Sequence, residues 1–264
     1  MDLQISDKVA LVTGSTQGIG FATAKLLAQE GAEVIVNGRS TIKVDEAVKK
    51  IKASVEGAKV RGVVADLGDA VGCKILTDSV KEVDILINNV GIFEPVDFLE
   101  ITEAQWLEMF NVNVMSGVRL TQHYLPAMFK KDWGRIEFIS SESAYQIPQE
   151  MIHYGMTKTA QISLARGIAE TTKGTGVTCN SIIVGPTSSE GVTDFIENLA
   201  KTNNQSFEEV EKEFFKSIRP TSLLQRFSTS EEIANLIVYT ASTLASATNG
   251  AALRVDAGVV RSAV

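Results

Sequence analysis

The sequence predicts an α/β fold: an open, doubly wound, mainly parallel sheet of about seven strands with helices on both faces. Three observations predict it. Short apolar runs without polar alternation recur along the chain, as expected of strands that are buried on both faces. Longer stretches with helical periodicity separate these runs, and a glycine-rich turn directly follows the first run.

The first half of the chain alternates strands and helices in order. Apolar runs predict strands at residues 8–13, 33–37, 60–66 and 84–88. Apolar side chains at helical spacing predict helices at residues 18–30, 44–55 and 71–80, and Gly31 ends the first of them. We expect the helices to form right-handed crossovers between parallel strands.

The second half continues the alternation. A capping box at Thr102–Gln105 opens a long helical region towards Met128, and another at Thr229–Glu232 opens the last helix. Between these regions, a helix is predicted through Tyr154 to about Thr171. Apolar runs predict the remaining strands at residues 135–140, 177–183 and 252–255.

One long segment, Pro186 to Phe227, breaks this alternation. It contains a third capping box, Ser206–Glu209, and apolar side chains at helical spacing: Phe207, Val210, Phe214 and Ile218. Inserts of this kind often cover the ligand crevice, so we predict a substrate lid; a surface helical hairpin is the alternative. The chain shows no internal repeat or linker-like break, so residues 1–264 are expected to form a single domain.

The composition argues against several classes of protein. The chain is 44% hydrophobic and 22% charged with a formal net charge of −7, and it lacks the Lys/Arg cluster of a nucleic-acid-binding protein. Its two cysteines, Cys73 and Cys179, and its two histidines are scattered, which disfavours a disulfide framework and a metal site. Residues 233–253 are uncharged but too polar for a membrane span, and no signal peptide is evident. A cytoplasmic protein without a membrane partner is expected.

The glycine-rich turn lies between the first strand and the first helix and reads TGSTQGIG. Glycines at such a turn let the backbone approach a pyrophosphate, and the N-terminal end of the helix favours the phosphate charges. A tight turn without a ligand is the alternative. We expect a dinucleotide to contact the residues of this loop: Gly14, Ser15, Thr16, Gln17, Gly18, Ile19 and Gly20.

The end of the second strand bears on the choice of nicotinamide cofactor. NAD sites usually place a carboxylate there, but this chain has Asn37-Gly38-Arg39-Ser40. The Arg39 guanidinium can pair with a 2′-phosphate and Ser40 can add a donor, which favours NADP(H) over NAD(H). A solvated loop arginine is the alternative interpretation, and NAD(H) remains possible.

Two further strand ends are expected to reach the same crevice. Asp66, followed by Leu67, ends the third strand, where its carboxylate can accept from an adenine amino group or cap the following turn. The fourth strand ends at Asn89, Val90 and Gly91. Ligands of open α/β sheets bind at these carboxyl ends.

The candidate catalytic residues follow the fifth strand. Tyr154 and Lys158 are four residues apart, on one face of a predicted helix. A cation fixed near a phenol favours the phenolate and lowers the phenol pKa, which makes an acid–base group that works near neutral pH. Ser141 lies at the carboxyl end of the fifth strand, where its hydroxyl can hold a substrate carbonyl for the same phenol.

Together these motifs resemble the short-chain dehydrogenase/reductase family, in its shorter single-domain branch. The resemblance rests on TGSTQGIG, NNVG, Ser141, Tyr154-x-x-x-Lys158 and Val184-Gly185-Pro186-Thr187, and it extends over essentially the whole chain. It implies a Rossmann-like fold and an activity similar to that of 3-oxoacyl-thioester reductases. Val90 and Ala257 replace an alanine and a glycine of the usual pattern, and neither touches the catalytic chemistry.

The resemblance implies a role for each matching residue. Tyr154 would be the general acid–base, Lys158 would lower its pKa and bind the nicotinamide ribose, and Ser141 would orient the carbonyl. Asn113 matches the family's fourth catalytic position, which holds a water in the proton relay. Thr187, after Gly185, would meet the nicotinamide carboxamide. A homotetramer or homodimer is also implied, and the apolar C-terminal residues 251–264 are consistent with a buried end.

The leading functional hypothesis is an NADP(H)-dependent reductase of a ketone or a 3-oxoacyl thioester. An alcohol or sugar dehydrogenase is the first alternative, and a non-catalytic dinucleotide-binding regulator is the second. The presence of Ser141, Tyr154 and Lys158 argues against the regulator. The small-molecule substrate is expected to meet the residues after Gly91, residues 143–151 and the insert, a set that includes Phe93, Glu94, Glu142, Ile147, Glu150 and Phe195. His153 and Trp106 are expected to be structural.

Overall fold

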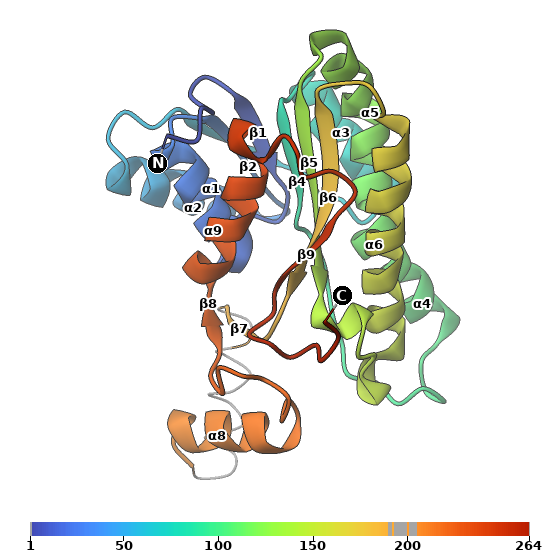
Figure 1. Cartoon of the computed structure of the whole chain (residues 1–264). Helices are drawn as coiled ribbons and strands as arrows, with labels where there is room; N and C mark the ends of the chain where they lie inside the picture. Colours follow the sequence, from blue (N-terminus) through green and yellow to red (C-terminus); the bar gives the residue numbers. More distant parts are fainter. Residues whose placement is uncertain (1, 190–191, 193–199, 201–204, 264) are drawn as a thin grey trace.

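A computed structural model describes residues 2–189, 192, 200 and 205–263 of the chain. Its main feature is one parallel sheet of seven strands in the order β3-β2-β1-β4-β5-β6-β9 (Figure 1). The strands are β1 (Val9–Val12), β2 (Glu33–Gly38), β3 (Val60–Val64), β4 (Ile85–Asn88), β5 (Gly134–Ser141), β6 (Val177–Val184) and β9 (Ala252–Val255). The predicted doubly wound fold is confirmed.

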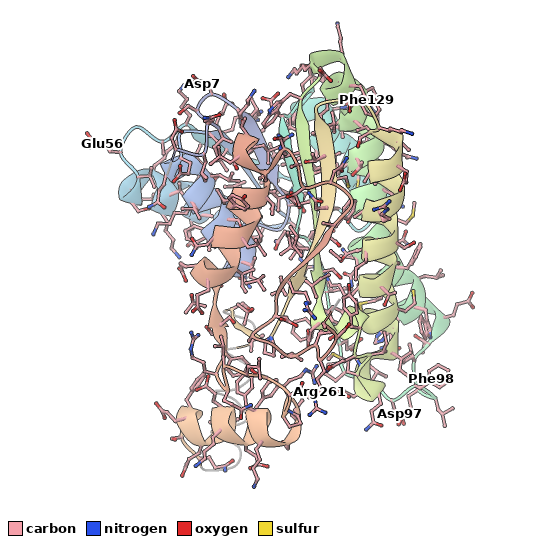
Figure 2. The ribbon with its side chains drawn as sticks, viewed as in Figure 1. Asp7, Glu56, Asp97, Phe98, Phe129 and Arg261 are labelled. Carbon is pink, nitrogen blue, oxygen red and sulfur yellow. The ribbon has the colours of Figure 1, made fainter. Side chains whose placement is uncertain are left out.

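Helices cover both faces of the sheet (Figure 1). One face carries α1 (Gly18–Gln29), α2 (Thr41–Ser54) and α9 (Ser230–Thr240), with α9 packed along α1. The other face carries α3 (Ala70–Ser79), α5 (Ser116–Lys131) and α6 (Ile152–Thr171). Each layer buries its own apolar cluster against the sheet, and side chains fill the space between helices and strands (Figure 2). This burial on both faces explains why the strands read as unbroken apolar runs. Cys73 and Cys179 are buried free thiols.

The predicted helical region from Thr102 is helical but not uniform. The capping box at Thr102 opens α4 (Glu103–Phe110), the backbone then widens into a π-helical turn (Asn111–Met115), and α5 follows. Such turns are rare, and they are frequently found at functional sites. Here the turn holds Asn113, whose amide bonds to the N–H and the carbonyl of Ile92 at 2.8 and 2.9 Å.

Both remaining capping boxes form as predicted. Ser206 and Glu209 cap α8 (Phe207–Ser217), and Thr229 and Glu232 cap α9. A two-stranded sheet that the sequence did not predict, β7 (Thr187–Ser188) with β8 (Ser228–Thr229), joins the two ends of the insert. Residues 190–191, 193–199 and 201–204 of the predicted lid lie outside the described residues.

The uncharged stretch from 233 to 253 forms most of α9, a short 3-10 turn (Thr243–Ala245) and the start of β9, as its polarity predicted. Within the described ranges, no helix is long and apolar enough to cross a membrane. Two further 3-10 turns, Glu142–Ala144 and Gln149–Met151, connect β5 to α6. These turns form one wall of the site described next.

Candidate active site

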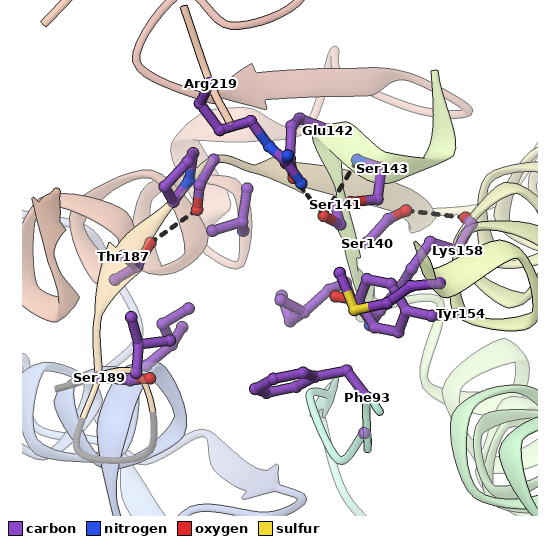
Figure 3. A pocket seen from close by; sticks show the side chains of 18 of the residues that line it. Phe93, Ser140, Ser141, Glu142, Ser143, Tyr154, Lys158, Thr187, Ser189 and Arg219 are labelled. Carbon is purple, nitrogen blue, oxygen red and sulfur yellow. Dashed lines mark hydrogen bonds and ion pairs between the residues drawn. The ribbon is translucent and has the colours of Figure 1, made fainter. Parts of the chain in front are cut away.

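A cavity of about 500 Å³ opens at the carboxyl ends of β4, β5 and β6 (Figure 3). Three of the predicted catalytic residues, Ser141, Tyr154 and Lys158, line it. So do members of the predicted cofactor-binding set: Ile19, Asn89, Gly91, Gly185 and Thr187. The structure therefore brings segments that are far apart in the sequence to one edge of the sheet.

The glycine-rich loop is fixed by a side chain that sequence reasoning did not select. Asn37, at the end of β2, accepts the Gly14 N–H at 3.3 Å and donates to the carbonyls of Val63 and Ala65 at 3.2 Å each. Its backbone N–H donates to the Ser15 hydroxyl at 3.0 Å. A buried amide at the end of an otherwise apolar strand was the signal, because such a group must find partners.

The opposite side of the loop is held by Asn89. Its amide donates to the carbonyls of Thr13 and Gly14 at 2.9 and 3.0 Å. A Cβ on Gly20 would lie 2.5 Å from the Asn89 amide nitrogen and from the Gly14 carbonyl, so only glycine fits there. Gly14 and Gly18 have φ of 59° and 58°, in the left-handed region that favours glycine.

The N-terminal end of α1 fits the diphosphate of a dinucleotide. Gln17 occupies the N-cap without a side-chain cap, and the first turn holds no acidic residue. Side chains cap α2, α3, α4, α8 and α9, whereas α5 and α6, like α1, begin without a side-chain cap. What distinguishes the start of α1 is the loop before it, whose glycines let backbone approach closely to an anion at the positive dipole end of the helix.

Two cations lie beside this loop. Arg39 is exposed directly after β2, and Lys43, in the first turn of α2, lies 3.5 Å from the Gln17 side-chain oxygen. Ser40 caps α2 by accepting the Lys43 N–H at 3.5 Å, so its hydroxyl keeps its proton for another acceptor. Sequence reasoning found Arg39 and Ser40 but missed Lys43. The Ser40 cap places Lys43 in the first turn of α2, beside the loop.

Asp66 takes the turn-capping position that the sequence left open. Its carboxylate accepts the Gly68 N–H at 3.0 Å, and the residue is exposed. Leu67 is 2% exposed, and its side chain packs in the apolar core cluster. Val90 packs in part against the same core cluster.

Tyr154, Lys158 and Ser141 lie together in Figure 3. The Lys158 ammonium is 5.5 Å from the centre of the Tyr154 ring and donates to the Ile139 carbonyl at 2.8 Å and to Gln161 at 3.2 Å. Burial lowers the pKa of Lys158 to about 8. Gln161 also donates to the backbone carbonyl of Asn113 at 2.6 Å, which links the fourth predicted residue to the lysine.

The expected lowering of the Tyr154 pKa is not what the structure shows. Burial raises the pKa of this phenol first, and the Glu142 carboxylate raises it further. The hydrogen bond with Ser141 and the charge of Arg219 lower it only in part. The ammonium of Lys158 is instead directed at the Ile139 carbonyl and Gln161, so spacing along a helix did not predict its effect.

Glu142 and Arg219 complete the site, and the sequence did not reveal their pairing. The Arg219 Nε donates to Glu142 Oε1 at 2.8 Å, while the Ser141 hydroxyl donates to Glu142 Oε2 at 2.5 Å (Figure 3). Glu142 was expected in the pocket; Arg219 is 77 residues away and follows α8. No local pattern connects two residues at such a separation.

The other pocket expectations are met in part. Phe93 and Glu150 line the cavity, whereas Glu94 and Ile147 do not, because Glu94 accepts from Gln105 and Ile147 packs on Gly155. Phe195 lies outside the described residues. His153 is buried away from the cavity with its ring 5.7 Å from Trp106, as expected of a structural residue.

The fold and the site together define an α/β protein with a dinucleotide-type loop beside a Tyr–Lys–Ser cluster. The family model for short chain dehydrogenases matches residues 8–200. The uncharacterized oxidoreductase YvaG of Bacillus subtilis is 47% identical over 262 residues, which cover 99% of each chain. The 3-oxoacyl-[acyl-carrier-protein] reductase FabG of Aquifex aeolicus is 31% identical, over 98% of this chain and 100% of that protein.

Solved structures agree with this family. L-sorbose reductase from Gluconobacter frateurii, solved in complex with NADPH and L-sorbose, superposes with a TM-score of 0.94 at 28% identity, over 99% of this chain and 100% of that one. The chain belongs to the short-chain dehydrogenase family, and the predicted resemblance is confirmed. It is an oxidoreductase of that family.

Proposed function

We propose that the protein reduces a ketone or a 3-oxoacyl thioester with NADP(H), using Tyr154 as the general acid. The carrying observation is that the Tyr154 phenol, the Ser141 hydroxyl and the Lys158 ammonium line one cavity that also reaches the glycine-rich loop at Ile19. A carbonyl oxygen beside Tyr154 would meet the phenol O–H, and it would meet a second donor once the Ser141 hydroxyl turns to it from Glu142, its acceptor in this structure.

The cofactor would be held by residues of this chain that already suit it. The loop from Gly14 to Gly20 and the start of α1 would take the diphosphate, and Asn89 and Gly91 would border the nicotinamide side. Arg39 and Lys43 would pair with a 2′-phosphate, and the NADPH of the L-sorbose reductase complex supports that choice. When bound, the nicotinamide supplies the hydride. NAD(H) stays the weaker alternative.

The acid–base step follows from the state of Tyr154. Because burial and Glu142 raise its pKa, the phenol carries its proton at neutral pH and can act as the general acid towards a carbonyl oxygen. The same group would act as the base in the reverse reaction, so reduction is proposed on the cofactor preference that Arg39 indicates. Lys158 would bind the ribose, Gln161 would hold the lysine in place, and Asn113 would hold a water of the proton relay.

The insert and the assembly belong to the same proposal. Phe214, Ile218 and Phe227 of the described part of the insert line the cavity, which supports a lid over the substrate within a single domain. β9 is an edge strand of the sheet, and pairing or packing of this edge with another copy would support the expected homo-oligomer. A cytoplasmic location remains an expectation.

The direct test is an assay of NADPH oxidation with three probes: a short 3-oxoacyl thioester, ethyl 3-oxobutanoate and L-sorbose. We expect turnover of at least one probe and a loss of about 100-fold or more in Tyr154→Phe, since general acid catalysis contributes that much. Tyr145→Phe, in the neighbouring turn but outside the cavity lining, is the matched control and should keep its activity. Full activity of Tyr154→Phe would reject the proposed role.

A further inference from the structure

An ion pair gives one end of the cavity its polar character. Glu142 and Arg219 both line the cavity, and their side chains are 7% and 15% exposed. The Arg219 Nε donates to Glu142 Oε1 at 2.8 Å, and Figure 3 shows the pair beside Ser141. Most side chains that line the rest of the cavity are apolar, among them Ile92, Phe93, Met151, Phe214 and Phe227. The pair is therefore the place where this cavity can recognise a polar group of a substrate beyond its carbonyl.

Both members of the pair keep hydrogen-bonding capacity for a ligand. Within the described residues, Arg219 donates from Nε to Glu142 and from Nη1 to the Ile218 carbonyl at 3.0 Å, and no bond uses Nη2. Glu142 accepts from Arg219 on one oxygen and from the Ser141 hydroxyl on the other, and each carboxylate oxygen can accept a second bond. A donor and an acceptor thus lie side by side in the cavity wall.

The state of Ser141 also calls for a substrate group at this place. The serine has one hydroxyl proton, and in this structure Glu142 Oε2 accepts it at 2.5 Å. If the serine turned to a substrate carbonyl alone, it would take a hydrogen bond away from a buried carboxylate, which is costly. A second donor that replaces the serine on Glu142 removes that cost.

We propose that the cavity takes neutral ketones with a hydroxyl on the carbon next to the carbonyl, and that Glu142 and Arg219 recognise this hydroxyl. A hydroxyl is both a donor and an acceptor, so one group satisfies the pair by donating to Glu142 and accepting from Arg219 Nη2. Glu142 Oε2 lies one hydrogen bond beyond Ser141, where a hydroxyl next to the carbonyl would lie. The substrate hydroxyl replaces the serine proton on Glu142, and the serine proton is then free for the carbonyl oxygen.

This inference rests on the proposed function and narrows its substrate class. A 2-oxo acid would bring a carboxylate to Arg219, but the Glu142 carboxylate beside the same guanidinium would repel it. A simple ketone would displace water from the pair without replacing its hydrogen bonds, and buried polar groups left unpaired lower affinity. A site built to bond a hydroxyl therefore discriminates strongly against the analogue that lacks it.

The test compares four small carbonyl compounds in the NADPH oxidation assay. Butan-2-one has a methyl group in place of the hydroxyl of 1-hydroxypropan-2-one and is nearly the same size. 1-Methoxypropan-2-one keeps the electron-withdrawing oxygen but has no O–H, so it separates recognition from reactivity, and pyruvate carries a carboxylate. We expect kcat/KM for 1-hydroxypropan-2-one to exceed that for butan-2-one and pyruvate by about 100-fold, and that for the methoxy ketone by about tenfold.

Arg219→Met and Glu142→Gln each remove one partner of the hydroxyl. Each should reduce the preference for 1-hydroxypropan-2-one over butan-2-one about tenfold. The ratio of the two kcat/KM values decides the question, because a defect in Ser141 or in folding lowers both values alike. Arg226→Met is the matched control, since it breaks an ion pair with Glu232 that is 46% and 42% exposed and lies outside the cavity lining. It should leave the ratio unchanged.

The outcomes separate this inference from the proposed function. A wild-type preference for butan-2-one or pyruvate would overturn the inference, and so would a preference for the hydroxy ketone that Glu142→Gln retains in full. Glu142→Gln keeps the size of the side chain, so it still gives the answer when Arg219→Met does not fold. A wild-type protein that turns over none of these ketones and none of the three earlier probes, or a fully active Tyr154→Phe, would instead overturn the proposed function itself.

Discussion

The two ends of the site are built differently, although both lie on the carboxyl edge of one sheet. At the dinucleotide end, Asn37 and Asn89 hold the loop through its backbone groups, from the strands on either side of β1. At the substrate end, Ser141 is held by the side chain of Glu142, which depends on Arg219 from the insert. The first end is part of the sheet, and the second depends on a separate segment.

The difference indicates a division of tasks. Asn37 and Asn89 fix the backbone of the glycine-rich loop. A fixed backbone is enough to bind a pyrophosphate, because the pyrophosphate is recognised by the tight turn and by N–H groups. The substrate end depends on side-chain contacts with the insert, so the sequence of the insert can vary without disturbing the sheet. We therefore expect substitutions at the dinucleotide end to alter cofactor affinity, and those at the substrate end to alter turnover.

The largest effect is expected at the substrate end from Ser141→Ala. Loss of this hydroxyl removes a donor to the developing oxyanion, so kcat should fall about 100- to 1,000-fold while the Kd for NADPH stays the same. Thr159→Ala is the matched control, because it also removes a hydroxyl that bonds backbone near this turn but does not line the cavity. Steady-state kinetics with calorimetry of NADPH binding measures both. An equal loss in Thr159→Ala would contradict the assignment.

The next effect tests the dinucleotide end. Asn37→Ala removes the acceptor for the Gly14 N–H, so we expect the Kd for NADPH to rise about tenfold and the free energy of unfolding to fall by about 1–3 kcal/mol. Asn180→Ala is the control, since this buried amide also bonds two backbone groups, Thr248 O and Ala251 N, away from the loop. It should lose similar stability but no affinity. Weaker NADPH binding in both variants would show that the loss of affinity reflects lost stability and not the contact between Asn37 and the loop.

Glu137, a buried acid of β5, lies at neither end of the site, so a substitution there serves as a reference for stability alone. Burial raises the pKa of Glu137 to about 8, and Asn180, Thr240 and Arg135 offset that rise only in part. The folded state therefore binds a proton that the unfolded state releases above its ordinary pKa of 4.5. This group's contribution to stability is full below pH 4.5 and declines as the pH rises towards 8.

Chemical denaturation across that pH range measures the decline. In Glu137→Gln the free energy of unfolding should depend less steeply on pH than in the wild type, because the amide does not titrate. The affinity for NADPH should be the same in Glu137→Gln as in the wild type, because Glu137 belongs to neither end of the site. An unaltered pH dependence in the variant would show that Glu137 is ionised in the folded protein.

The smallest effect is expected near the C-terminus, where Ala257 has a φ of 57° and its carbonyl accepts from Leu223 of the insert at 2.8 Å. Alanine is strained in this left-handed region, so Ala257→Gly should stabilise the protein by about 0.5 kcal/mol after the entropic cost of glycine. Ala160→Gly, inside α6, should destabilise it by about 1 kcal/mol. A loss of stability in both variants would contradict this explanation.

Sequence reasoning predicted what local patterns encode. Apolar runs gave the strands, three capping boxes gave helix starts, and the TGSTQGIG loop was placed correctly. The π-helical turn at Asn113, the β7–β8 pair and Lys43 beside Gln17 were not predicted, because each depends on contacts with another segment.

The same difference between local patterns and distant contacts holds for the chemistry of the site. The spacing of Tyr154 and Lys158 predicted that they share a cavity, which they do. It did not predict the direction of the Tyr154 pKa, which follows from burial and from Glu142. The partner of Glu142 lies 77 residues away, and no periodicity links them.

The central claim, an NADP(H)-linked enzyme, is tested most directly by calorimetric titration of the purified protein with NADPH and, separately, with NADH. We predict tighter binding of NADPH and a loss of about tenfold or more of that preference in Arg39→Ala, with NADH binding unchanged. Arg61→Ala, an exposed arginine of β3, is the matched control. Equal or tighter binding of NADH by the wild type would contradict the claim and favour alcohol oxidation.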